Sequence, residues 1–202
     1  GVLEAWALAS DRWLYTIDPS ELHLTMLQAL VSESGRFSAT GAKDAFVRIW
    51  SSDSGELLRE LGPFVPENSN EQIMAMAFSR DEESIFAGCG DAHLREWLIS
   101  TGELIGETST HTTNQIVVVD TDHLSVSAQY SGTINLFDLR RGWSFLSGQP
   151  MEAGSVASIA SGNRSGSPID ISSDRRNVLF SDAKTPVRLL ELHHLMPTHP
   201  DT

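Results

Sequence analysis

The sequence predicts an all-β protein built from a repeated unit of short strands. Two observations support this prediction. The segment DAFVRIW, Asp44 to Trp50, returns as DAHLREW, Asp91 to Trp97, and each copy is followed by a polar turn that ends in Gly-Glu. The two tryptophans are 47 positions apart, a period typical of solenoids and propellers. The chain is therefore expected to be an array of similar units.

The charge of the sequence indicates which kinds of molecule the protein is expected to bind. The 202 residues carry 27 acidic and 14 basic side chains, for a net charge of −13. A field of this sign repels phosphate backbones and anionic lipid surfaces. The densest basic clusters, Arg140-Arg141 and Arg175-Arg176, are only pairs beside acidic residues. We therefore expect no direct binding of nucleic acid or membrane, and we expect protein partners with basic surfaces.

The single cysteine, Cys89, excludes an internal disulfide framework and a cysteine-only metal site. No apolar run approaches the roughly 20 residues that span a bilayer, and the N-terminus lacks the pattern of a secretory signal. The sequence begins Gly-Val-Leu without a methionine. We expect an intracellular protein, cytoplasmic or nuclear, that is a processed product or part of a longer polypeptide or complex.

The first complete unit is expected at residues 27–62. Polar turns at Glu33-Ser34-Gly35, Asp44 and Asp53-Ser54-Gly55 separate its short apolar runs, as in antiparallel strands. The four expected strands are Leu27 to Ser32, Phe37 to Thr40, Phe46 to Trp50 and Glu56 to Leu61.

Two further units repeat this order at residues 72–107 and 115–147. In the third unit Ser131 stands at the Asp position and Phe137 at the Trp position. The strands expected in the second unit are Ile73 to Phe78, Ser84 to Gly88, His93 to Ile99 and Glu103 to Gly106. Those expected in the third are Gln115 to Val119, Leu124 to Gln129, Thr133 to Asp138 and a run near Trp143 to Leu146.

In the rest of the C-terminal half the repeat motif is harder to recognise. Residues 148–167 are rich in Gly and Ser and are expected to be a long loop or insertion, with Val156 to Ala160 as a further strand candidate. Residues 168–192 form the last expected unit, in which Asp182 opens the turn before the third strand. Residues 193–202 are expected to be a flexible tail.

The opening residues 1–26 do not carry the repeat motif. We interpret them as a partial or degenerate unit with strands around Ala5 to Ala9 and Trp13 to Ile17. An amphipathic helix over Pro19 to Leu30 is the alternative, because short apolar runs fit either structure.

The repeated order of strand, turn, strand, Asp turn, strand ending in Trp, and Gly-Glu resembles the WD40 repeat. This resemblance covers Leu27 to Leu192 and implies a β-propeller of four-stranded antiparallel blades. At about 40 to 45 residues per blade the chain makes roughly five blades, fewer than this family usually closes with. Val2 to Leu8 is a candidate closing strand for the last blade; otherwise the chain is part of a larger propeller.

The resemblance also implies structural roles. In the family, the turn Asp tightens the turn between the second and third strands. A His ahead of the first strand links this Asp by hydrogen bonds, through a Ser, to the indole N–H of the Trp. The matching structural residues in this sequence are Asp44, Trp50, Asp91, Trp97, His111 and, in the last unit, Asp182.

No catalytic residue, cofactor or metal site is expected. Gly41-Ala42-Lys43 lacks the ending of a phosphate-binding loop, and Cys89 between glycines is expected to be a small buried residue. His193, His194 and His199 lie beside prolines and lack a fourth ligand held by a fold.

The repeat favours a non-enzymatic protein-interaction scaffold, because blades present loops on one rigid face. In this family partners contact the turns before the Asp and the starts of the first strands. The matching partner-binding candidates are Lys43, Gln72, Gly90, Gln115 and Tyr130. The alternative is a propeller-framed hydrolase or lyase with a site in the central channel, in which Arg48, Arg95 and Arg188 recur.

Overall fold

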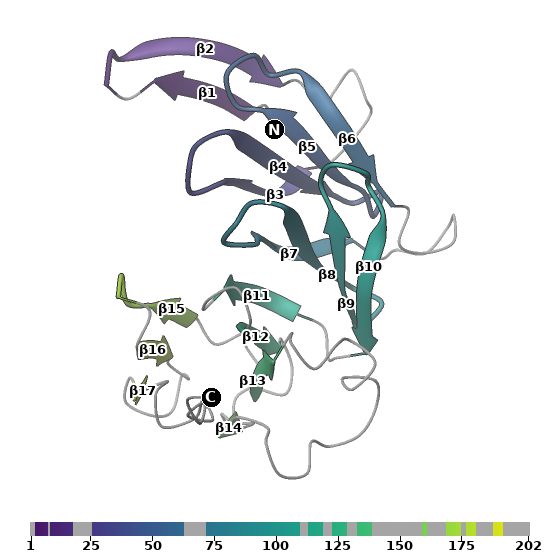
Figure 1. Ribbon diagram of the computed structural model, residues 1–202, viewed down its shortest axis with the longest axis vertical. Helices are drawn as coiled ribbons and strands as arrows, with labels where there is room; N and C mark the ends of the chain where they lie inside the picture. Colours follow the sequence, from purple (N-terminus) through teal and green to yellow (C-terminus); the bar gives the residue numbers. More distant parts are fainter. Residues whose placement is uncertain are drawn as a thin grey trace, which may run out of the picture.

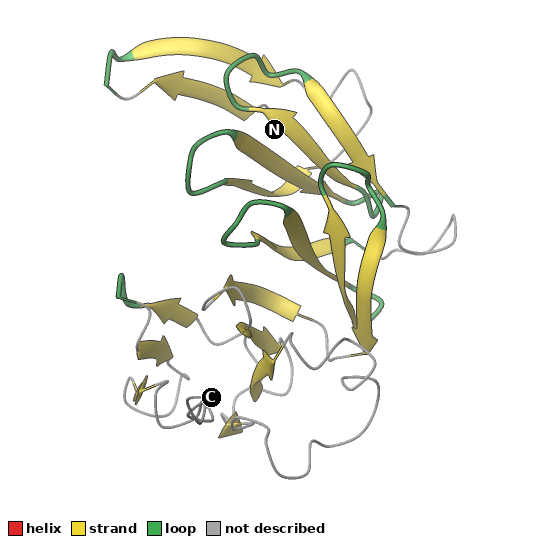
Figure 2. Ribbon diagram, viewed as in Figure 1, coloured by secondary structure: helices red, strands yellow, loops and turns green. Residues whose placement is uncertain are grey.

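The structure, a computed structural model, is built of β-strands joined by turns. It describes residues 3–7, 9–17, 26–62, 72–109, 113–118, 123–128, 133–138, 159–160, 169–174, 177–180 and 188–191. Within these ranges every regular element is a strand, as Figure 2 shows.

The strands form five antiparallel sheets that follow the order of the sequence. The first sheet has β1 (Leu3–Ala7) and β2 (Arg12–Ile17). The second has β3 (Met26–Val31), β4 (Phe37–Ala42), β5 (Val47–Ser51) and β6 (Leu57–Leu61). The third has β7 (Ile73–Phe78), β8 (Ser84–Cys89), β9 (His93–Leu98) and β10 (Leu104–Ser109).

The last two sheets complete the series. The fourth has β11 (Thr113–Val118), β12 (His123–Ala128), β13 (Thr133–Asp138) and β14 (Ile159–Ala160). The fifth has β15 (Ile169–Ile171), β16 (Asn177–Phe180) and β17 (Arg188–Glu191). In every sheet neighbouring strands are consecutive in the chain, so each sheet is a meander.

The first strands of successive sheets lie next to one another. Strand β7 contacts both β3 and β11, and β11 contacts β15. The second to fifth sheets are therefore arranged around the side of their first strands. In Figure 1, β1 and β2 lie at the top and β15–β17 at the lower left. This is the arrangement of propeller blades, and the predicted fold class is confirmed.

In the second blade, burial is greatest in the two middle strands. All six residues of β4 are buried, and four of the five in β5. In β6 only Leu61 is buried. The middle strands are covered on both faces by neighbouring sheets, so most of their side chains are apolar, and the buried Thr40 and Arg48 have hydrogen-bond partners. The outer strand meets water. The core between the second and third sheets includes Phe37, Ile49, Leu61, Ile73, Met76, Phe78, Ile85 and Trp97.

Two glycines allow the sheets to approach closely. A Cβ atom on Gly41 would lie 2.5 Å from Cγ2 of Ile73, the first residue of the next sheet. A Cβ atom on Gly88 would lie 2.6 Å from Cβ of Thr113, again the first residue of the next sheet. In two successive blades the same position of the second strand is therefore a glycine, and the first strand of the next blade packs against it.

The N-terminal hairpin is a further copy of the outer half of the repeat, in the segment that the sequence analysis interpreted as a partial or degenerate unit. Trp6 pairs with Trp13 directly after a β-bulge, as Trp50 pairs with Leu57 after a bulge at the same place. In both pairs the partner follows the tryptophan by seven residues. The turn residue Asp11 has φ 47°, where the second sheet has Gly55 at 74°. Trp6 therefore occupies the Trp position of the repeat.

The structure decides between two pairs of alternatives, and one strand lies elsewhere than expected. Residues Leu3–Ala7 pair with β2, and no described strand of the last blade pairs with them. Met26–Val31 is a strand, as expected for Leu27 to Ser32, and not the end of the alternative helix, because it pairs with β4. The strand that pairs with β13 is β14 (Ile159–Ala160), whereas we expected it near Trp143 to Leu146, which lie outside the described residues. The residue limits of the expected units stay predictions.

Candidate interaction face

The turns between the second and third strands are built in the same way in two blades. The carboxylate of Asp44 accepts a hydrogen bond from the backbone N–H of Phe46 at 3.2 Å. Asp91 accepts one from the N–H of His93 at 3.0 Å. The alanine between each pair has a φ of 61°, in the left-handed region. An aspartate side chain that bonds the backbone two residues on stabilises such a turn.

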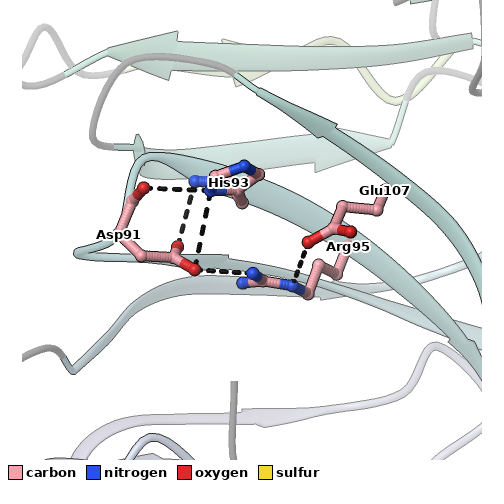
Figure 3. Close-up of polar contacts among 4 residues, drawn as sticks. All are labelled: Asp91, His93, Arg95 and Glu107. Atoms are coloured by element: carbon pink, nitrogen blue, oxygen red, sulfur yellow. Dashed lines mark hydrogen bonds and ion pairs between the residues drawn. The ribbon is translucent and has the colours of Figure 1, made fainter. Parts of the chain in front are cut away.

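The same two aspartates bind the recurrent arginines. Nη2 of Arg95 donates to Oδ2 of Asp91 at 2.6 Å, and Nε donates to Oε1 of Glu107 at 2.7 Å (Figure 3). In the preceding blade Arg48 donates to Asp44 at 2.7 Å and to Glu60 at 2.8 Å. Each arginine joins the turn to the third and fourth strands of its blade.

Both arginine side chains are largely withdrawn from water, with exposed fractions of 7% for Arg48 and 10% for Arg95. Burial by itself lowers the pKa of Arg95, but its hydrogen bonds and ion pairs with Asp91 and Glu107 outweigh burial and raise it. The guanidinium therefore stays charged, and its task is to hold the turn in shape. Arg recurs at this position because it holds the turn and the third and fourth strands of each blade together.

The tryptophans that end the third strands are buried, with 6% of Trp50 and 5% of Trp97 exposed. The indole N–H of Trp50 donates to Oγ1 of Thr40 at 2.9 Å. Thr40 lies on the neighbouring strand β4, and sequence reasoning did not select it, although a hydroxyl within a mostly apolar strand was a signal for it. His111, which was assigned to this kind of network, and Asp182 lie outside the described residues.

The structure places some of the partner-binding candidates together. Lys43 is exposed on the turn before Asp44, and Gly90 holds the same position before Asp91. The N–H of Gly90 donates to the carbonyl of Gln72 at 3.0 Å, so this turn and the start of the first strand meet at one end of the sheet. Gln72 and Gln115 are half-buried, each at or near the start of a first strand.

Tyr130 lies outside the described residues, so its place relative to Lys43, Gln72 and Gly90 stays a prediction. We name the end of the sheets that carries Lys43, Gln72 and Gly90 the turn face. Among the described residues no group of three or more His, Cys, Asp and Glu side chains is placed to hold a metal ion. In the same ranges no helix is long and apolar enough to cross a membrane.

No protein-family model matches the sequence. Among curated proteins, the chain is 33% identical to autophagy-related protein 16 of Arabidopsis thaliana over 108 residues, 52% of this chain and 20% of that protein. It is 26% identical to the small ribosomal subunit protein RACK1z of Oryza sativa subsp. japonica over 102 residues, 50% of this chain and 29% of that protein.

A third relative, the cross-pathway control WD-repeat protein 2 of Flammulina velutipes, is 26% identical over 105 residues, 50% of this chain and 32% of that protein. The matches thus span about a fifth to a third of each relative. These relatives are WD-repeat proteins, in agreement with the four-stranded antiparallel sheets. Over about half its length this chain is related to WD-repeat proteins, and its fold is that of WD40-like propeller blades.

Proposed function

We propose that the chain is an intracellular, non-enzymatic scaffold that binds protein partners through the turn face, as part of a larger assembly. The observation that carries this proposal is the repeated turn itself. Two rigid turns of one shape present different residues at the same position, Lys43 in one blade and Gly90 in the next. A rigid frame with variable turn residues is suited to recognition.

The chemistry of the described residues supports a scaffold rather than an enzyme. Arg48 and Arg95 are each bound by two carboxylates and largely buried, so neither is directed at a substrate. The first strands β3, β7 and β11 contain no ionisable side chain, and β15 contains a single one, Asp170. A central-channel site in a propeller would require such side chains to converge from several first strands.

The acidic balance of the sequence supports partners with basic surfaces. Affinity capture at low and at high salt tests this part of the proposal. We expect recovery of the partners to fall as salt rises, because exposed charges are screened. Equal recovery at both salt concentrations would show that the partner surface is not electrostatic.

The turn face is tested by two matched variants that each remove one exposed cation from a turn. Lys43→Ala changes the turn face, whereas Arg80→Ala changes the turn between β7 and β8 at the opposite end of the sheets. We expect Lys43→Ala to weaken capture of the partners and Arg80→Ala to leave it unchanged. Equal capture by the two variants and the unmodified chain would refute a role for Lys43, and loss only with Arg80→Ala would place binding at the other end.

A further inference from the structure

Strand β10 is the outer edge of a complete four-stranded sheet. The strand order of this sheet is β10-β9-β8-β7, and among the described residues β10 pairs with β9 alone. Figure 1 shows β10 at the outer margin of its blade, on the side away from β7. The outer edge of such a strand presents backbone N–H and C=O groups with which a further strand can pair.

The first two side chains of β10 form an exposed apolar pair. Leu104 is 46% exposed and Ile105 is 43% exposed. Leu104 lies opposite Trp97 of β9, and Ile105 is the extra residue where the register shifts before Gly106. Bulges of this kind re-aim side chains. The edge of β10 therefore begins with two neighbouring apolar side chains that meet water.

The outer strand of the preceding blade, β6, provides a comparison. Leu57 corresponds to Leu104, since each follows the tryptophan of its blade by seven residues, and the next residue, Leu58, corresponds to Ile105. Leu57 is 43% exposed, but Leu58 is only partly buried and packs against the core. Strand β6 therefore presents one apolar side chain where β10 presents two.

A charged residue lies on the edge of β6 and not at the same position of β10. Arg59 of β6 donates to the carbonyl of Ser100 in the next blade at 2.6 Å. The equivalent residue of β10 is Gly106, which is buried. A charged side chain on an edge strand hinders the addition of another strand, because pairing would withdraw the charge from water. Of the two matched strands, β10 is therefore the better acceptor for an added strand.

The charges around β10 indicate which partner fits this edge. Residues 91–109 contain four carboxylates and one arginine, Arg95, which already binds two of them. Glu103 is exposed directly before the apolar pair, and 44% of the side chain of Glu107 is exposed after it. A second copy of this chain would bring the same carboxylates together and carries a net charge of −13, so like charges oppose it. A basic segment complements this edge.

We propose that the outer edge of β10 binds an extended segment of a partner protein, which adds a fifth strand to this blade. Apolar side chains of the segment cover Leu104 and Ile105, and its lysine or arginine residues face Glu103 and Glu107. Main-chain hydrogen bonds supply affinity in this mode of recognition, and the side chains supply specificity. The site lies on the outer rim of the blade, so it does not depend on the proposed role of the turn face.

A short basic peptide tests this site on the unmodified chain. The probe is acetyl-Thr-Lys-Val-Thr-Val-Lys-Thr-amide, titrated while hydrogen exchange of single amides is followed by NMR. We expect saturable protection in Leu104–Ser109 and unchanged exchange in Leu57–Leu61. The same peptide with glutamate in place of both lysines is expected to give no protection. The proposal is overturned if β10 is not protected, if β6 is protected equally, or if both peptides act alike.

Matched variants place a lysine on each of the two edges. Ile105→Lys and Leu57→Lys each change a side chain that is 43% exposed. We expect Ile105→Lys to weaken binding of the basic peptide by about tenfold, because like charges then meet, and Leu57→Lys to change it by less than about twofold. Equal binding by both variants and the unmodified chain would overturn the proposal.

Two further measurements separate loss of binding from loss of structure or from self-association. Glu103→Lys changes an exposed turn residue and should weaken binding as Ile105→Lys does, while far-UV circular dichroism and urea unfolding show that each variant is folded. Lys43→Ala should bind the peptide normally, so failure at β10 is distinguishable from failure of the turn face. Protection of β10 that rises with chain concentration and dimer formation, without peptide, would overturn the proposal because the occupant is then a second copy.

Discussion

Glu82 accepts two hydrogen bonds from Ser34, one from its backbone N–H and one from its hydroxyl, both at 2.6 Å. The two residues lie 48 positions apart, in the turns between first and second strands of neighbouring blades. A carboxylate acceptor makes both bonds charge-assisted. The side-chain bond from Ser34 is the largest cause that lowers the pKa of Glu82 from its ordinary 4.5.

This contact predicts a loss of stability in acid. A carboxyl whose pKa is lower in the folded than in the unfolded protein stabilises the fold above the unfolded pKa, and this contribution is lost as pH falls through the folded pKa. We expect Glu82→Gln to be less stable than the unmodified chain at pH 7 and equally stable well below pH 4.5. Urea unfolding across this range measures the difference. A difference that does not change with pH would contradict the prediction.

The arginine network predicts a large effect from its buried carboxylate. Asp91→Ala removes the partner of Arg95, whose side chain is 10% exposed. The variant leaves the largely buried guanidinium with only the half-exposed Glu107 as its anionic partner, so we expect the free energy of unfolding to fall by about 3 kcal/mol. Glu107, with 44% of its side chain exposed, provides the control. Glu107→Gln should cost less than about 1 kcal/mol in the same urea titration, and equal losses would show that burial does not set the strength of these bonds.

Close packing of successive blades predicts coupling between Gly88 and Thr113. Gly88→Ala forces a Cβ atom against Thr113, which has no exposed surface, and should cost about 1 to 3 kcal/mol. Thr113→Gly removes the opposing Cβ. The double variant should therefore lose less stability than the sum of the two single variants. The pair Gly35→Ala and Thr113→Gly should be additive, because nothing lies within 4 Å of a Cβ on Gly35. Additivity in the first pair would contradict the contact.

Cys89 is expected to be unreactive while the protein is folded. It is 1% exposed, and burial raises the pKa of its thiol, so both access and thiolate formation are reduced. Iodoacetamide labelling of the unmodified chain should follow the rate of opening of the blade. In the variant Ser100→Cys, whose residue 100 is exposed, a second thiol should label at once. Rapid labelling of Cys89 in the folded chain would contradict its burial.

Most strands were predictable because their signals are local. Ile73–Phe78 and Thr133–Asp138 are apolar or alternating runs bounded by polar turns, and their limits match the expectation. The Asp turns were also readable, since Asp44 and Asp91 bond the backbone only two residues away. A pattern confined to a few residues is read from one sequence without knowledge of the rest.

The N-terminal unit was expected only as a partial or degenerate one, because its residues depart from the motif. Glu4 stands where the next two units have Arg, and Asp11 stands where their turns have glycine, so the letters differ although the backbone is the same. Bulge position and a positive φ are properties of the folded backbone. They show that Trp6 occupies the Trp position, which the letters alone did not.

By itself the sequence determined the all-β class, the repeated unit and the acidic balance, since these follow from composition and from patterns within single strands and turns. Only the tertiary structure decided that Ser34 binds Glu82, that Thr40 binds Trp50 and that Trp6 takes the Trp position of its hairpin. Each of these features depends on which strands and turns lie next to one another, and those neighbours cannot be read from a single sequence.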